Sequence, residues 1–186
     1  MTGIGSAGAT VSKGHLKSEA LSISNFPTGW SVDNSANTGN QGCVSALRDP
    51  GSHVTKVDVK FSDGNAPDLE EVLMSGSGAS RRFAKVSHAL SKCKSYTASS
   101  GGQTATVHVG AMSFPPVGQS SSAYSFTLTV QGINLGADLV LFRFGQTYGA
   151  VEYEDIGSPD ITQAQAYVTE AVNKVEGKPT KTPPRF

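Results

Sequence analysis

The segment RRFAKVSHALSKCKS, residues 81–95, decides the fold that we expect. At 3.6 residues per turn, its apolar side chains recur on one side of a helix. This stripe comprises Phe83, Val86, Leu90 and Cys93. We therefore predict a helix over about residues 79–92 whose apolar stripe faces a sheet, with a cysteine on that inner side.

On both sides of this helix, apolar and polar residues alternate with the period of two that is typical of half-buried strands. Residues 137–145 are apolar at nearly every position, which favours a strand in the middle of the sheet, buried on both faces. The predicted strands cover residues 53–64, 68–76, 103–114, 123–132, 137–145 and 148–157. A short helix is expected over CVSALR, ended by Pro50.

The last helix is expected to begin at the segment SPDI, with Ser158 as its cap and Pro159 at its first position. Gly177 ends it. Its apolar stripe comprises Ile161, Ala164, Val168, Ala171, Val172 and Val175. The order of strands, helix, strands and helix predicts an α+β fold: a single domain with a mainly antiparallel sheet and helices packed on one face.

The chain has 186 residues, which suits one domain with short tails. Residues 1–18 are rich in small and polar side chains and are expected to form a flexible leader. The domain is then expected over residues 19–177, and residues 178–186 form a proline-containing tail.

Only two cysteines are present, Cys43 and Cys93. They could be two inert buried thiols, part of a metal site, or a disulfide. No other Cys or His lies near either cysteine at the spacing of a metal site, so we favour the disulfide. Such bonds persist outside the cytosol, which indicates an extracytoplasmic location.

Several segments carry a resemblance to a known family. They are LSISNFPTGWSV (21–32), VTKVDVKF (54–61), ASRRFAKVSHALSKC (79–93), SFPPVGQSSSAY (113–124) and LVLFRFG (139–145). Together they resemble exported lipoproteins of actinobacteria that are often labelled sensor-domain lipoproteins. The chain is more distantly similar to the extracellular domain of a mycobacterial serine/threonine kinase. The likeness covers about residues 16–176 and implies a secreted or envelope-anchored domain.

Charge and hydropathy exclude other classes. Fifteen basic residues balance fifteen acidic ones, so no nucleic-acid partner is expected. No apolar run approaches the ~18 residues of a membrane span. No secretory signal is visible, so an exported chain would carry its targeting segment, and any N-terminal lipid anchor to the membrane, ahead of Met1.

Catalytic patterns are scarce. The four histidines form no pair at metal-binding spacing, so neither a metal nor a cofactor is expected. Glu152 and Glu154 point to the same side of one strand, ~7 Å apart. Carboxylates at that spacing can serve glycoside chemistry or bind Ca²⁺, although on the outer face of an edge strand they are more often solvated.

We therefore expect a non-enzymatic binding or sensor-like domain of the cell envelope, whose partner is a small or apolar ligand or an envelope protein. The alternatives are a carrier of a lipid or other apolar envelope molecule, and an extracytoplasmic hydrolase built from scattered Ser, His and acidic residues. The aromatic side chains proposed to line a ligand site are Trp30, Phe142, Phe144, Tyr148 and Tyr153.

Overall fold

The structure is a computed structural model, and it describes residues 11–35, 41–48, 54–100 and 102–183. Pro50, His53 and the first ten residues of the expected leader lie outside these ranges. The elements are α1 (Lys13–Glu19), a 3-10 turn η1 (Ile23–Asn25), β1 (Ser31–Val32), η2 (Gly42–Val44), α2 (Ser45–Arg48), β2 (Thr55–Ser62), β3 (Asp68–Ser75), α3 (Ala79–Lys92), β4 (Ser95–Ser100), β5 (Gln103–Ala111), β6 (Ser120–Val130), β7 (Ile133–Phe144), β8 (Thr147–Ile156) and α4 (Ile161–Val175).

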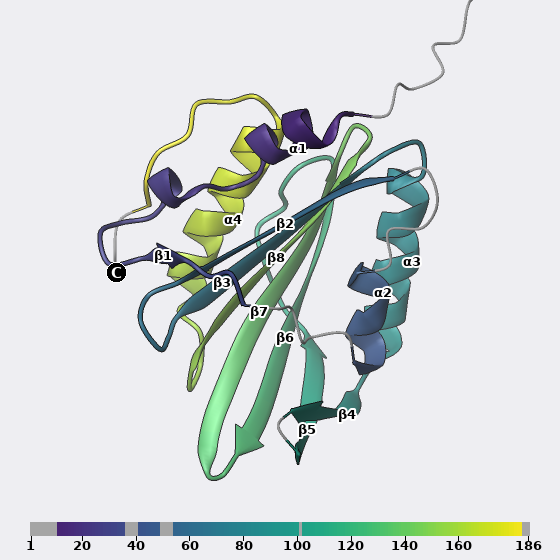
Figure 1. The fold of residues 1–186 in the computed structure, drawn as a ribbon. Coiled ribbons are helices and arrows are strands. Elements are labelled where there is room, and N and C mark those ends of the chain that lie inside the picture. Colours follow the sequence, from purple (N-terminus) through teal and green to yellow (C-terminus); the bar gives the residue numbers. More distant parts are fainter. Residues whose placement is uncertain (1–10, 36–40, 49–53, 101, 184–186) are drawn as a thin grey trace, which may run out of the picture.

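One antiparallel sheet of eight strands organises the domain, in the order β1-β2-β3-β8-β7-β6-β5-β4 (Figure 1). The expected α+β class and antiparallel sheet are confirmed. β7 lies near the centre between β6 and β8, as its mostly apolar sequence predicts. The last strand along the chain, β8, pairs with β3 as well as β7, so it joins the early and late strands into one sheet.

Helices cover both faces of this sheet, and this corrects the expectation of a single covered face. Phe142 of β7 packs in the core beneath α1 and α4, whereas its neighbour Leu141 packs in the core beneath α2 and α3. Figure 1 shows the two helix pairs on opposite sides of the strands. Below, these sides are called the α4 face and the α3 face. Fully burying a Leu or Phe side chain contributes ~1.5–3 kcal/mol, so both layers stabilise the fold.

The helix α3 has the bounds predicted from its apolar stripe, Ala79–Lys92. Val86 and Leu90 are fully buried, and the ring of Phe83 meets the ring of Tyr148 edge-on with centroids 6.4 Å apart. The predicted disulfide is present between Cys43 and Cys93, whose Cα atoms lie 6.1 Å apart. It fastens η2 to the end of α3.

The helix α4 begins two residues later than the sequence suggested. Asp160, not Ser158, is its cap: the carboxylate Oδ1 accepts the N–H groups of Thr162 at 2.8 Å and Gln163 at 3.2 Å. Asp160 prevails because its carboxylate reaches two unpaired N–H groups at the positive end of the helix. Ile161 of the predicted stripe is exposed, and the other five positions are buried as expected.

Both ends of the domain extend further than predicted. Residues 13–18, expected in a flexible leader, belong to α1, whose Leu16 is fully buried against the α4 face. At the other end, the N–H of Lys181 donates to Glu170 Oε2 at 2.7 Å, and the Thr182 hydroxyl donates to the carbonyl of Ser24 at 3.1 Å. Residues 178–183, the described part of the expected tail, therefore fold back along α4 as far as η1.

Candidate functional site

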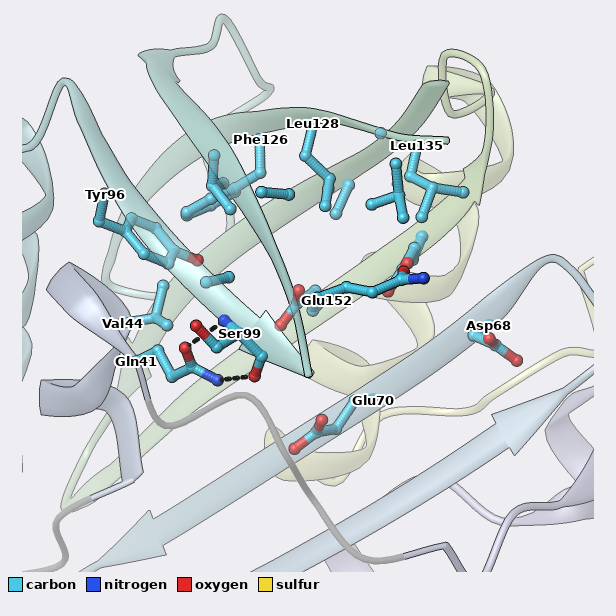
Figure 2. Close-up of a pocket in the computed structure, with 18 of the residues that line it drawn as sticks. Gln41, Val44, Asp68, Glu70, Tyr96, Ser99, Phe126, Leu128, Leu135 and Glu152 are labelled. Atoms are coloured by element: carbon cyan, nitrogen blue, oxygen red, sulfur yellow. Dashed lines mark hydrogen bonds between the residues drawn. The ribbon is translucent and has the colours of Figure 1, made fainter. Parts of the chain in front are cut away.

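A pocket of about 450 Å³ opens on the α3 face, beside the helices that cover the rest of that face. This volume lies within the ~300–1,000 Å³ typical of small-molecule sites. Its lining comes from Gln41, from η2 and from the strands β2 to β8 (Figure 2). The lining residues are Gln41, Val44, Lys60, Asp68, Leu69, Glu70, Tyr96, Ala98, Ser99, Gln103, Thr104, Ala105, Val107, Phe126, Leu128, Val130, Leu135, Gly136, Ala137, Glu152 and Glu154.

One side of the pocket is apolar because the strands keep their period of two beyond the end of the helices. Along β6, the side chains that pack under α3 continue into Phe126 and Leu128, which line the pocket. Leu135 of β7 and Val107 of β5 extend this surface. Only part of it is shielded, since Phe126 is buried while Leu128 and Leu135 are half-buried.

The β4–β5 hairpin forms a wall of the pocket. β5 pairs with β6 over His108–Ala111, whereas its pairing with β4 runs on to Gln103. The stretch of the hairpin beyond the β6 ladder therefore contributes side chains to the pocket, including Tyr96 and Ala105. Burial, and to a lesser degree the charges of Glu152 and Glu154, raise the pKa of Tyr96 to about 12, so its hydroxyl stays protonated.

The opposite side of the pocket is acidic (Figure 2). Asp68 and Glu70 come from β3, and Glu152 and Glu154 come from β8. In the register of these strands, Asp68 lies directly opposite Glu154, and Glu70 lies directly opposite Glu152. Side chains opposite one another in an antiparallel pair have Cβ atoms only ~5 Å apart, so four carboxylates share one small area.

Burial and mutual repulsion raise the pKa of two carboxyl groups on this acidic side, Asp68 and Glu154. The pKa of Glu154 is raised mainly by burial and then by the charge of Asp68. Burial is also the main cause of the raised pKa of Asp68, although the ammonium of Lys60 opposes it. Lys60 Nζ itself contacts Asp33 Oδ2 at 3.1 Å and donates to the Ser35 hydroxyl at 3.1 Å. Acidic groups therefore outnumber basic ones among the side chains that line the pocket in the described chain.

The wall that carries Tyr96 is held in place from outside the sheet. The Gln41 side-chain amide donates to the Ser99 carbonyl at 2.7 Å and accepts the Ser99 N–H at 2.6 Å (Figure 2). The next residue, Gly42, has φ of +56° and lies so close to Tyr96 that a Cβ atom would overlap the ring. Cys43 then forms the disulfide with Cys93, just before β4. Three consecutive residues thus brace β4.

None of the five aromatic residues proposed from the sequence is among those that line the pocket. The core of the α4 face buries three of them, Trp30, Phe142 and Tyr153, and Phe144 packs against that core. Tyr148 is buried on the other face, under α3. Their size and apolarity make them core residues. The sequence offered no way to distinguish the two roles.

The shared orientation predicted for Glu152 and Glu154 agrees with the structure, because both line the pocket. They lie on a central strand and are half-buried, which corrects the expectation of a solvated edge. Asp68 and Glu70 were missed, although they show the same acid-x-acid spacing as Glu152 and Glu154. That common spacing was the one available signal.

The lining limits the chemistry that the pocket can perform. Among the described residues, no three His, Cys, Asp or Glu side chains converge in a way that could hold a metal ion. The residues that line the pocket in the described chain contain carboxylates and hydroxyls but neither histidine nor cysteine. In this part of the chain the arrangement provides charge, shape and apolar surface.

Comparison with solved structures finds the same fold elsewhere. The extracellular domain of PknH from Mycobacterium tuberculosis matches with a TM-score of 0.68 and 12% sequence identity, covering 89% of this chain and 98% of that chain. At the level of fold, this confirms the distant likeness to the extracellular domain of a mycobacterial kinase. No protein-family model and no curated protein sequence matches the chain. Among the described helices, none is long and apolar enough to cross a membrane.

Proposed function

We propose that this chain is a non-catalytic, extracytoplasmic, sensor-like domain that binds a small ligand in the pocket on the α3 face. The observation that carries the proposal is the pocket itself, which has about 450 Å³ and two chemically distinct sides. Its shared fold with the extracellular domain of PknH supports a role outside the cytoplasm. The Cys43–Cys93 disulfide supports the same location, because such bonds are rare in reducing compartments.

The construction of the pocket also favours binding over simple packing. Solid cores need no external brace, whereas the wall formed by β4 is fixed by Gln41 and by the disulfide next to it. A wall held from outside keeps a cavity open without a ligand, which lowers the cost of ordering when a ligand binds. We propose in addition that the domain is anchored to the cell envelope by a lipid attached ahead of Met1.

A second function, carriage of a lipid or another apolar envelope molecule, draws support from the apolar side formed by Phe126, Leu128 and Leu135. A carrier would bind a range of molecules of similar shape and release them. A sensor domain would bind one molecule selectively and would contact another protein.

The test is mass spectrometry of both aqueous and organic extracts from protein purified from its native source. We expect one dominant bound molecule, at near one per chain. Ala98→Phe, which adds a ring on the pocket side of β4, should reduce that yield at least tenfold. Thr97→Phe adds the same ring at the exposed neighbouring position and should leave the yield unchanged. Equal yields in the two variants would contradict binding in this pocket.

A further inference from the structure

The pocket combines an apolar side with an acidic side, and a ligand that fits it must satisfy both. The apolar side is formed by β5, β6 and β7, where Phe126 and Leu128 form a continuous surface. The acidic side is formed by β3 and β8. Figure 2 shows Phe126, Leu128 and Leu135 on one side and Asp68 and Glu70 on the other, with Glu152 between them.

The acidic side costs stability. Like charges directly opposite one another on adjacent antiparallel strands destabilise the sheet, and Asp68 and Glu154 have this arrangement. Both side chains are half-buried, where repulsion is stronger than in bulk water. A polar or apolar pair at these two positions would serve the sheet better, so the carboxylates are explained by something other than folding.

Among the described residues that line the pocket, Lys60 is the only basic one. It lies opposite Glu70 in the β2–β3 register, but its ammonium contacts Asp33 and Ser35, at the rim of the sheet. Asp68 and Glu154 face each other, with Lys60 as the lining lysine, so these three side chains leave a surplus of acidic over basic groups. A positively charged ligand would balance this surplus inside the pocket.

We propose that the pocket binds an amphiphilic organic cation, with its ammonium or guanidinium group against the carboxylates of β3 and β8 and its apolar part along Phe126 and Leu128. This inference rests on the proposed binding function and names the chemical class of the ligand. The apolar part provides affinity through burial, and the cationic group provides selectivity, because an anion of the same shape meets repulsion.

The test uses three probes with the same chain and different head groups: octylammonium, octanol and octanoate. Binding is measured by isothermal titration calorimetry at low ionic strength and neutral pH. We expect octylammonium to bind at least tenfold more tightly than octanol, and octanoate to bind most weakly. Added salt should weaken octylammonium more than octanol, because screening affects only the charged probe.

Variants assign the preference to the acidic side. The double variant Asp68→Asn/Glu154→Gln should abolish the preference for octylammonium while octanol binding persists. It should also fold at least as stably as the parent, since it removes two like charges that face each other. Glu154→Gln alone should shift the preference in the same direction. Asp58→Asn is the matched control, because Asp58 of β2 also points to the α3 face but does not line the pocket.

Each outcome is decisive for the ligand class. If octanol and octylammonium bind equally, or octanoate binds best, the cation proposal is wrong while binding in the pocket stands. If none of the three probes binds, amphiphiles are excluded as ligands, and the extraction experiment alone then decides whether the pocket binds something else. If the preference persists in the double variant, the carboxylates of Asp68 and Glu154 are not its source.

Discussion

The carboxylate of Glu71 accepts the backbone N–H of Leu21 at 2.6 Å inside the core of the α4 face. Leu21 follows α1, so this bond fastens the N-terminal segment to the middle of β3. The second oxygen, Oε1, has no hydrogen-bond partner among the described residues. Burial raises the pKa of Glu71 to about 7, while the Leu21 N–H and the charge of Lys174 oppose that rise.

This pKa makes the stability of the domain depend on pH. The folded state holds the Glu71 proton more tightly than the unfolded state, in which the pKa is near 4.5. The contribution to stability is therefore complete below about pH 4.5 and is lost as the pH rises to about 7 and beyond. The loss is roughly 3–4 kcal/mol at most, at ~1.4 kcal/mol for each unit of pKa.

Glu71→Gln should remove this contribution. We expect the free energy of unfolding of the variant to vary less with pH than that of the parent between about pH 4.5 and 7. Urea denaturation at a series of pH values measures it. The difference between the two proteins isolates Glu71 from Asp138, whose pKa burial raises to about 6. Asp58→Asn controls for loss of a surface carboxylate, and parallel curves for parent and Glu71→Gln would contradict the expectation.

Elements with a strong apolar periodicity were predicted from the sequence, whereas elements with a weak periodicity were missed. The stripe of α3 and the alternation of β6 were sufficient, because burial on one side imposes a pattern. β4, Ser95–Ser100, lies at the edge of the sheet and is mostly polar, so no such pattern marks it. α1 has a single fully buried side chain, Leu16, within a Gly-, Ser- and Lys-rich segment.

The pocket could not be predicted from the sequence for a different reason. Its acidic side exists only because β8 pairs with β3 across the sheet, which places Asp68 opposite Glu154. Strand alternation shows which way each side chain points, but not which distant strand lies beside it. Helices on both faces also went unpredicted. The apolar run of β7 indicated burial on both sides, yet it did not tell which helix covers each side.

Breaking the disulfide should destabilise the domain and loosen the pocket. The chain-entropy contribution of a loop closed across 50 residues is ~4 kcal/mol, so Cys43→Ala/Cys93→Ala should lose up to that amount. The loss is measured by urea denaturation of the variant against the oxidised parent. Reduction of the parent should reproduce it. Reduction that leaves the unfolding midpoint unchanged would show that the crosslink does not limit stability.

Gly42→Ala should perturb the wall of the pocket through Tyr96. A Cβ atom at this position would overlap the ring, and φ is +56°, so the substitution combines a clash with backbone strain. Gly64→Ala is the matched control: φ is +72°, and nothing lies within 4 Å of its Cβ position. We expect ~1 kcal/mol of destabilisation from strain in the control, and clearly more in Gly42→Ala.

The decisive readout for Gly42→Ala is ligand binding, because a shifted Tyr96 changes the shape of the pocket. Gly42→Ala should lose affinity for the molecule that the extraction experiment identifies, whereas Gly64→Ala should retain that affinity. Equal affinity in the two variants would show that Tyr96 does not define the binding surface.

The cap of α4 gives the sharpest test of the difference between the expected and observed helix start. Asp160→Ala removes an acceptor for the N–H groups of Thr162 and Gln163, so it should cost ~1 kcal/mol of stability. Ser158→Ala, at the position that the sequence favoured, should cost almost nothing. Thermal and urea unfolding of the two single variants measure the difference. The reverse order of stabilities would place the helix start at Ser158, because a cap stabilises only the helix that it begins.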